Sequence, residues 1–219
     1  MSDNKIVVVL LGKPGAGKGT QGIKLSQRNG WAHISTGDLL REEMQQTGEV
    51  ADQLKAIMGS GQLVSPEIVV PILYKKIQSV DSAGVILDGF PRNHAQAQLL
   101  ESHDVKVTHV VYFDIQDDVV VQRLSGRLMH KPSGRVYHEV NQPPKVTGLD
   151  DVTGEPLVRR VDDQPDVIRN RLKVYADETL PLLDYYRSKE GVQLYHLEVT
   201  GKSIDEVSTM LMSCFQVKA

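Results

Sequence analysis

The strongest constraint on the fold lies near the start of the chain, where an apolar run leads into a glycine-rich segment. In residues 5–11 (KIVVVLL), every residue after Lys5 is apolar, without alternation. This predicts a strand buried on both faces, as in a parallel sheet. Residues 12–20 (GKPGAGKGT) follow, and a helix is expected from about Lys18 to Asn29. In this strand–turn–helix context, glycines let several N–H groups point into one concavity beside the positive helix end. The sequence predicts a phosphate-binding loop, called here the P-loop.

Apolar runs recur along the chain and alternate with stretches of helical period. Further strands are expected near residues 84–87, 107–113 and 192–197, and further helices near 67–79, 94–102, 117–127 and 167–188. This alternation predicts a doubly wound α/β fold with right-handed crossovers. Two stretches interrupt it. Residues 36–64 contain short helical patterns and two glycine breaks, and residues 126–163 are rich in Gly, Pro and polar residues, which favours a functional segment or an inserted subdomain.

Composition excludes several classes of protein. A chain of 219 residues suits one or two domains, and its net charge of −3 provides no basic field for nucleic acid. The longest apolar run is too short to cross a bilayer, and the polar leader 1–5 lacks the features of a signal peptide. A single cysteine, Cys214, rules out an intramolecular disulfide framework and a cysteine zinc cluster. We expect a soluble, cytoplasmic monomer without nucleic-acid or membrane partners, in which Cys214 serves packing.

The P-loop departs from the strict pattern, in which Ser or Thr directly follows the lysine. Here Gly19 comes between Lys18 and Thr20, which indicates a subfamily of nucleotide-binding proteins. Lys18 is expected to reach the outer phosphates, whereas Lys13 is expected to be a solvated side chain. A P-loop alone leaves GTPase, ATPase, kinase and motor open, although no Asn-Lys-x-Asp guanine motif follows a strand.

Two further motifs carry charged residues at expected strand ends. In residues 36–41 (TGDLLR), Thr36 or Asp38 is the expected helix N-cap, and Arg41 in a first turn would oppose the helix dipole unless an anion binds there. In residues 88–92 (DGFPR), Asp88 follows a buried strand, where α/β folds bind ligands, and could hold magnesium directly or through water. Arg92 could bind a phosphate from the same turn.

Four more arginines complete the candidate site. Arg123 and Arg127 are four residues apart on an expected helix and would share a face, and Arg160 and Arg171 flank the acidic turn 162–165. Each alone is explained equally well as a solvated surface cation. Together they fit phosphoryl transfer, in which positive groups surround the developing charge.

These motifs, in this order, resemble the adenylate kinases of the long-lid type. The resemblance runs from residue 6 to about 207 and rests on GKPGAGKGT, STGDLLR, DGFPRNHAQA, GRLMHKPSGRVYH, DDVTGEP and RRVDDQPDVIRNR. It implies reversible, magnesium-dependent phosphoryl transfer from ATP to AMP, giving two ADP. It also implies a P-loop core (residues 1–35, 65–125 and 164–219) with an inserted AMP-binding domain (36–64) and lid (126–163).

The resemblance also implies roles for individual residues. ATP would be bound by Gly15, Ala16, Gly17, Lys18, Gly19, Thr20, Arg123, Arg127, Val136, Tyr137 and Lys202, the last through its backbone. AMP would be bound by Thr36, Arg41, Gln62, Leu63, Val64, Gly89, Phe90, Pro91, Arg92, Gln96, Arg160 and Arg171. Asp88 would hold Mg²⁺ through water, and the catalytic groups would be Lys18, Arg92, Arg123, Arg127, Arg160 and Arg171.

The lid departs from the family branch that binds zinc through four cysteines. Those positions hold His130, Ser133, Asp150 and Thr153, which are a poor zinc ligand set. We expect a hydrogen-bonded network there and no structural metal. The residue after Tyr137 is His138, which favours ATP over GTP as the donor.

Gln96 is the expected specificity residue, because an amide can donate and accept at the N1 and N6 edge of adenine. The alternative for Gln96 is a polar helix residue that faces solvent. Alternatives for the whole protein are a GTP:AMP phosphotransferase, a UMP/CMP kinase, or a regulatory module with degenerate catalysis. The long lid and Gln96 argue against the pyrimidine kinase. The presence of Lys18, Arg92, Arg127 and Arg160 argues against the regulatory module.

Overall fold

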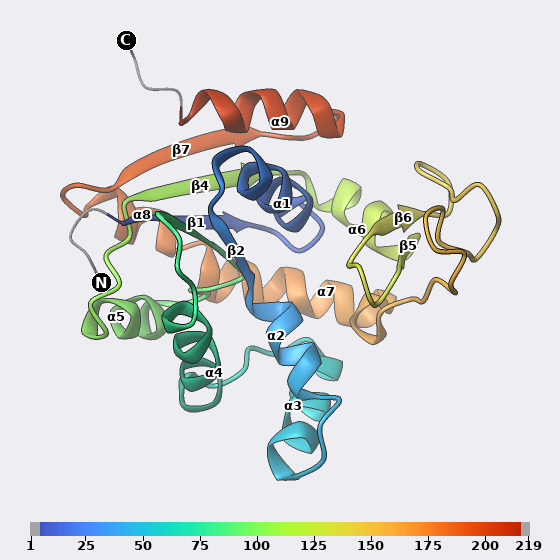
Figure 1. Cartoon of the computed structure of the whole chain (residues 1–219), viewed down its shortest axis with the longest axis horizontal. Coiled ribbons are helices and arrows are strands. Elements are labelled where there is room, and N and C mark those ends of the chain that lie inside the picture. The colour runs from blue at the N-terminus through green and yellow to red at the C-terminus, as the bar shows by residue number, and fades with distance from the viewer. Residues whose placement is uncertain (1–4, 216–219) are drawn as a thin grey trace.

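The computed structural model describes residues 5–215, so residues 1–4 of the polar leader and residues 216–219 lie outside the described part. A five-stranded sheet forms the centre of the molecule (Figure 1). Its order is β2-β3-β1-β4-β7, and every neighbouring pair is parallel. The strands are β1 (Ile6–Gly12), β2 (Ala32–Ser35), β3 (Gly84–Asp88), β4 (His109–Asp114) and β7 (Gln193–Glu198). The predicted doubly wound α/β fold is confirmed.

The continuous apolar sequence of β1 is explained by burial on both sides of the sheet. Val7, Val9 and Leu11 belong to one core cluster, whereas Val8 and Leu10 belong to the other. All five are at most 3% exposed. Because side chains alternate along a strand, neither face leaves room for a polar residue. The predicted two-sided burial is therefore confirmed.

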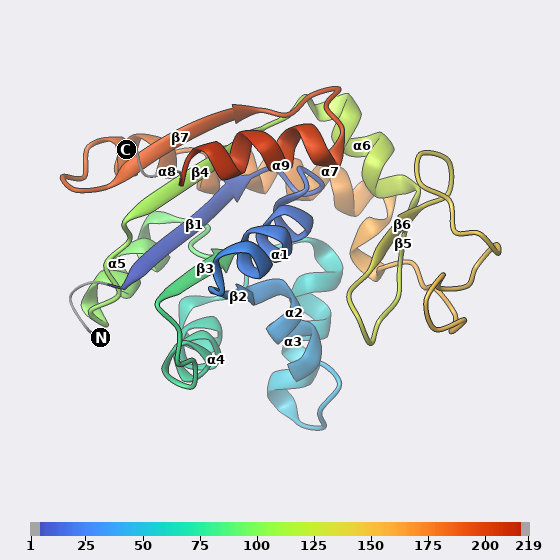
Figure 2. The same cartoon turned by 45° about the horizontal axis from the view of Figure 1, so that its top comes forward.

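Helices cover both faces of this sheet (Figure 2). They are α1 (Lys18–Asn29), α2 (Thr36–Glu43), α3 (Glu49–Ser60), α4 (Pro66–Gln78), α5 (His94–Ser102), α6 (Asp117–Ser125), α7 (Pro165–Val174), α8 (Leu182–Arg187) and α9 (Ile204–Ser213). Leu25 of α1 and Leu211 of α9 pack into one core cluster, and Leu73 of α4 and Leu100 of α5 pack into the other. Cys214 packs against the first of these clusters, as predicted.

Two parts of the chain stand away from the sheet (Figure 1). One is the pair α2 and α3. The other is a small antiparallel ladder of β5 (Arg127–Met129) and β6 (Val136–His138) with its long loops, which continues to a 3₁₀ turn at Val161–Asp163. These parts coincide with the two stretches in which the sequence loses its alternating pattern.

Several local expectations are wrong in detail. The N-cap of α2 is Ser35, whose hydroxyl accepts from the Asp38 N–H at 3.3 Å, so neither Thr36 nor Asp38 caps the helix. Arg41 consequently lies in the last turn of α2, where a cation is favourable for the helix dipole. Arg127 does not share the helix of Arg123, because α6 ends at Ser125 and Arg127 begins β5.

The expected long helix near residues 167–188 is also interrupted. It consists of α7, a π-helical turn at Tyr175–Thr179, and α8. In this turn the Leu180 N–H donates to the Tyr175 carbonyl at 2.9 Å, five residues back. Such turns occur frequently at functional sites.

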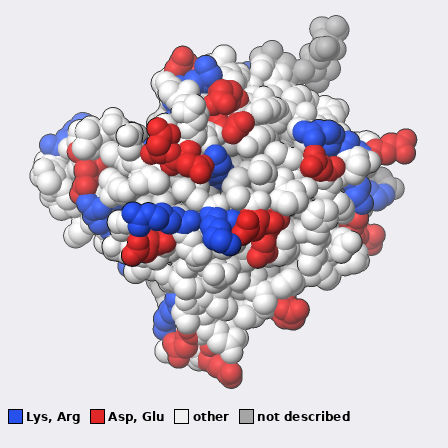
Figure 3. Space-filling view, turned by 180° about the vertical axis from the view of Figure 1, so that it is seen from behind, with Lys and Arg blue, Asp and Glu red and all other residues white. Residues whose placement is uncertain are grey.

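The helix lengths and the surface charges concern two classes that the sequence excluded, membrane-spanning and nucleic-acid-binding proteins. Within residues 5–215, none of the helices is long and apolar enough to span a bilayer. Figure 3 shows that, on the face seen from behind, Lys and Arg side chains are interspersed with Asp and Glu. That face therefore carries no uniform positive field.

Replacing Gly12, at the end of β1, should destabilise the fold. Its φ is +145°, and a Cβ there would lie 2.6 Å from the Phe113 carbonyl oxygen of the neighbouring strand. We expect Gly12→Ala to lower the free energy of unfolding by about 2–4 kcal/mol, measured by urea denaturation. Gly59→Ala is the matched control, because that helical position has open space around it and should gain up to about 1 kcal/mol. Equal effects of the two substitutions would contradict this account.

Candidate active site

One large cavity opens along the carboxyl ends of the strands, with a volume of about 1380 Å³. A site for one drug-sized ligand commonly measures roughly 300–1,000 Å³, so this cavity has room for more than one. All the residues that the sequence analysis assigned to nucleotide or magnesium binding line it. They come from the P-loop, α1, α2, the loop between α3 and α4, the end of β3 and the turn after it, α5, α6, β5, β6, the loop before the 3₁₀ turn, α7 and the loop before α9.

The P-loop forms one wall of the cavity. Gly17 takes a left-handed conformation with φ of 94°, and α1 begins at Lys18 directly after it. The Lys18 ammonium donates to the carbonyl oxygens of Gly12 at 2.7 Å and Lys13 at 2.9 Å. Burial lowers the pKa of Lys18 to about 8, although the nearby Asp88 carboxylate opposes the shift. The ammonium is thus held at the loop, and an anion that binds there would stabilise its charged form.

Lys13 is not the solvated side chain that the sequence predicted. Its ammonium donates to the Ile115 carbonyl at 2.6 Å and forms an ion pair with Asp117, also at 2.6 Å. Both partners follow β4, more than a hundred residues along the chain. Lys13 therefore fastens the P-loop to the start of α6 and is not directed at a ligand.

Asp88 lies at the carboxyl end of β3, beside the P-loop. Burial alone would raise the pKa of its carboxyl, but the neighbouring His33, Lys18 and Arg92 outweigh burial and hold that pKa below its ordinary value. A Cβ at Gly19 would lie 3.2 Å from Asp88 Oδ2, so the glycine leaves space beside the carboxylate. An ionised oxygen donor with open space next to a P-loop fits Mg²⁺ held through water.

Seven arginines line the cavity. Six of them are the candidates from the sequence and come from six different segments: Arg41, Arg92, Arg123, Arg127, Arg160 and Arg171. The seventh, Arg135, is paired with Asp150. Burial, followed by repulsion from Arg171, lowers the pKa of Arg92 to about 10. Burial, with repulsion from Arg127 and Arg41, likewise lowers the pKa of Arg160 to about 10. A guanidinium with a pKa this far above neutral keeps its charge at neutral pH. Because these cations repel one another, the cavity favours a polyanionic ligand.

Three aspartates form ion pairs with the cavity arginines, and the sequence analysis missed this role. Asp163, whose side chain is 2% exposed, accepts two bonds from Arg127, at 2.8 Å from Nε and 2.6 Å from the terminal nitrogen. Asp162 lies 3.0 Å from Arg171, and Asp38 lies 2.6 Å from Arg41. The acidic pair 162–163 was visible in the sequence, but it indicated only a turn into the next helix.

On the side of α2 and α5, the cavity presents polar groups of different kinds. Thr36 Oγ1 is buried without a hydrogen-bond partner, which marks a position for a ligand atom. Gln96 is 3% exposed, so it does not face solvent. Its Oε1 accepts from the Arg92 N–H at 2.7 Å, and its Nε2 donates to the Val64 carbonyl at a longer 3.4 Å.

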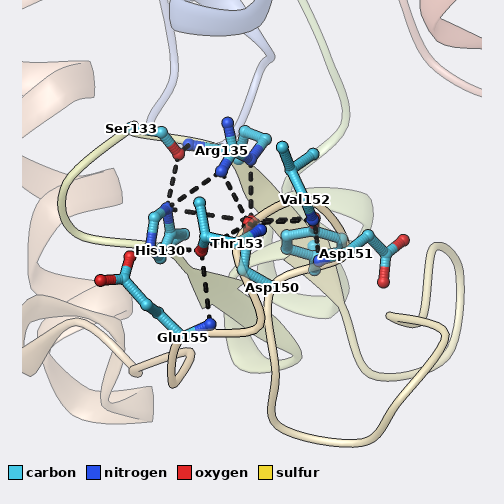
Figure 4. A network of polar contacts seen from close by, with 9 residues as sticks. His130, Ser133, Arg135, Asp150, Asp151, Val152, Thr153 and Glu155 are labelled. Carbon is cyan, nitrogen blue, oxygen red and sulfur yellow. Dashed lines mark hydrogen bonds and ion pairs between the residues drawn. The ribbon is translucent and has the colours of Figure 1, made fainter.

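Residues 126–163, the predicted lid, contain the expected hydrogen-bonded network (Figure 4). His130 bonds Ser133 at 2.7 Å, and the Thr153 hydroxyl donates to Asp150 at 3.0 Å. Two residues that the sequence analysis did not predict complete it: Arg135 forms a two-bond ion pair with Asp150, and Glu155 bonds His130 at 2.6 Å. A hydrogen bond from Arg135 is the main reason that the pKa of Asp150 lies below its ordinary value.

Comparison with known families agrees with this geometry. The family model described as adenylate kinase matches residues 10–191, most of the chain. The chain belongs to the adenylate kinase family. Adenylate kinases transfer a phosphoryl group to a nucleoside monophosphate, so this protein is a nucleotide-binding phosphotransferase. The match includes the P-loop, residues 126–163 and all seven arginines that line the cavity.

The pKa of Lys18 predicts how ATP binding to this adenylate kinase depends on pH. Above pH 8 the free lysine loses its proton, whereas bound phosphates stabilise the ammonium and raise its pKa. ATP affinity should therefore fall by up to roughly tenfold per pH unit above this pKa, and binding should take up a proton. Calorimetry between about pH 7 and about pH 9, in buffers with different ionisation enthalpies, measures the uptake. The same uptake in Lys18→Met would contradict the assignment.

The lid network predicts a local effect of removing one charge. Asp150→Asn should loosen residues 126–163, because the half-buried Arg135 loses its ionic partner while position 150 stays fully buried. We expect faster amide exchange in the lid and little change in the sheet, measured by hydrogen–deuterium exchange. The control is Asp151→Asn, since the Asp151 carboxylate bonds only the exposed Lys145 N–H. Identical exchange in both variants would show that the network does not stabilise the lid.

Proposed function

We propose that the protein catalyses the reversible, magnesium-dependent transfer of a phosphoryl group from ATP to AMP, giving two ADP and balancing the adenine nucleotides. One observation carries the proposal. A single cavity of about 1380 Å³ joins the P-loop lysine to a wall of arginines and to the unpartnered Thr36 hydroxyl. This arrangement suits two phosphorylated ligands that meet end to end over the cations.

The donor half is assigned to ATP. The P-loop N–H groups and Lys18 would hold its phosphates, with Arg123 and Arg127 approaching from the lid side. Val136, Tyr137 and the Lys202 backbone line the end of the cavity where the base would lie. The Arg123 side chain makes no ion pair or hydrogen bond within residues 5–215, and burial lowers its pKa. A phosphate bound beside it would therefore stabilise its charged form.

The acceptor half is assigned to AMP. Arg41, Arg92 and Arg171 would surround its phosphate, and Thr36 would supply a hydroxyl. The base would lie beside Gln96 and the backbone of residues 62–64, with the turn at 89–91 closing the site. The Gln96 Nε2 bond to Val64 is long at 3.4 Å, and exchanging it for a bond to adenine costs little.

The chemistry needs positioning and charge neutralisation rather than a base. An oxygen of the AMP phosphate is already anionic and attacks the γ-phosphorus of ATP, while the bond from that phosphorus to the β,γ-bridging oxygen breaks. Lys18, Arg92, Arg160 and Arg171 stabilise charge on the transferring group and on the leaving ADP. Bound through water at Asp88, Mg²⁺ would neutralise phosphate charge and orient the phosphate chain.

Water must be kept from the reacting phosphate, because hydrolysis would compete with transfer. We propose that the AMP-binding domain (36–64) and the lid (126–163) close over the core when both nucleotides are bound, as the family resemblance implies. The position of α2, α3 and the β5–β6 segment away from the sheet supports this division (Figure 1). We further propose a cytoplasmic monomer that acts on free nucleotides, with the hydrogen-bonded network in place of structural zinc.

A donor–acceptor matrix tests the proposed reaction. The purified protein with Mg²⁺ receives ATP or GTP against AMP, GMP, CMP and UMP, and diphosphate formation is measured. We expect ATP with AMP to exceed every other pair. A preference for GTP with AMP would overturn the assignment of ATP as the donor. A preference for CMP or UMP would overturn the assignment of AMP as the acceptor. If the folded protein binds nucleotide but turns over none of the pairs, the proposed catalytic activity is wrong.

Gln96→Ala tests the acceptor base. The variant should lose at least about tenfold in its preference for AMP over the other monophosphates, because an amide matched to adenine is removed. The KM for ATP should change by less than about twofold, since Gln96 lies in the acceptor half. Gln53→Ala is the control, because Gln53 is an exposed α3 glutamine bonded to Glu49. Unchanged selectivity of Gln96→Ala would contradict the assignment.

A further inference from the structure

The π-helical turn after α7 contacts the β3–α5 turn through a buried threonine. Thr179 is 7% exposed, and its hydroxyl donates to the carbonyl oxygen of Arg92 at 2.7 Å. The two residues are 87 positions apart in the sequence. A short hydrogen bond between sequence-distant buried groups fixes a backbone position that the local sequence does not fix.

Arg92 is held on both sides of its backbone. Its N–H donates to Gln96 Oε1 at 2.7 Å, and its carbonyl accepts from Thr179. Its Nε donates to the Gly89 carbonyl at 3.0 Å, which sets the course of the side chain. The backbone that carries the Arg92 guanidinium is therefore fixed by two buried side chains, Gln96 of α5 and Thr179 of the π turn.

The π turn is the reason that Thr179 reaches Arg92. The Leu180 N–H bonds the Tyr175 carbonyl five residues back, so one residue is inserted relative to an α-helix. One inserted residue rotates the following side chains by about 100° around the axis. Glu178, directly before Thr179, accepts from the Asn93 amide at 3.0 Å. Two successive residues of the turn thus hold two successive residues, Arg92 and Asn93.

The same stretch of chain also carries Arg171, on α7 directly before the π turn. Arg171 and Arg92 carry like charges and repel each other, and this repulsion adds to burial, the larger cause, in lowering the pKa of Arg92. Two like charges that must face one anion need fixed backbones, because each would otherwise move away from the other. The Thr179 bond joins the element that carries Arg171 to the backbone of Arg92.

We propose that Thr179 is a positioning residue of the acceptor site, which acts through Arg92 rather than on the nucleotide. Its hydroxyl fixes the distance between the Arg92 and Arg171 backbones, so that both guanidinium groups meet the phosphate of the monophosphate acceptor. This inference rests on the proposed function of the acceptor half.

The test compares Thr179→Val, which keeps the shape and removes the hydroxyl, with Thr179→Ser, which keeps the hydroxyl. We expect Thr179→Val to raise the KM for AMP by about 5- to 10-fold and to lower kcat, as for the loss of one buried hydrogen bond. The KM for ATP should stay within about twofold of the wild-type value, and Thr179→Ser should keep the wild-type KM for AMP within about twofold. If Thr179→Val does not fold, Thr179→Ala takes its place with the same expectation.

Two controls separate positioning from general destabilisation. Thr108→Val removes a threonine hydroxyl that donates to the Val7 carbonyl and accepts from the Val7 N–H, both at 3.0 Å. This site lies outside the cavity lining, so the substitution should lower Tm without changing the KM for AMP. In an Arg92→Ala background, Thr179→Val should change the KM for AMP by less than about twofold, because the group it positions is gone.

Three results would overturn the inference. They are a wild-type KM for AMP in Thr179→Val, an equal rise in the KM for both nucleotides, or an undiminished effect in the Arg92→Ala background. Each presupposes that the wild-type protein phosphorylates AMP. Absence of that activity in the wild-type protein would instead refute the proposed function, so the two failures are distinguishable.

Discussion

Mutual repulsion among the cations of one cavity is the constraint on which the rest of this structure depends. Lys18 and seven arginines line one cavity at an edge of the sheet, and burial lowers the pKa of Lys18, Arg92 and Arg160. Such a cluster is unfavourable unless carboxylates lie among the cations. Asp38, Asp162 and Asp163 supply that compensation, and polyanionic ligands would supply more. The fold brings these groups together because the carboxyl ends of parallel strands meet at one edge.

The features predicted correctly from the sequence are those encoded by contiguous residues. The apolar run of β1, the P-loop and the strand–helix alternation each depend on local period and turn chemistry, and they set the sheet and the edge where ligands bind. The P-loop, residues 36–41, residues 88–92 and Lys202 lie at or after the ends of strands of the sheet, so the fold itself brings these motifs to one cavity.

The features that were mispredicted depend on partners distant in the sequence or on one-residue shifts. Lys13 was expected in solvent because its partner Ile115 lies a hundred residues away. Arg41 was expected in a first turn because the N-cap of α2 was assigned to Thr36 or Asp38. The N-cap is Ser35, so Arg41 lies in the last turn. No sequence period marks a π turn, so the contact of Thr179 with Arg92 could not be predicted. Asp163, which pairs with Arg127 and Arg171, was interpreted from the sequence only as part of a turn into the next helix.

The central claim is that the cavity cations form a phosphate site whose repulsion an anion relieves. The most direct measurement is the Tm of the protein in tripolyphosphate, compared with chloride at the same ionic strength. At about 100 times the dissociation constant, the account predicts a saturating rise of about 5–10 °C in tripolyphosphate beyond the chloride effect. The same Tm in both salts would contradict it, because the cations would then be balanced fully by their aspartates.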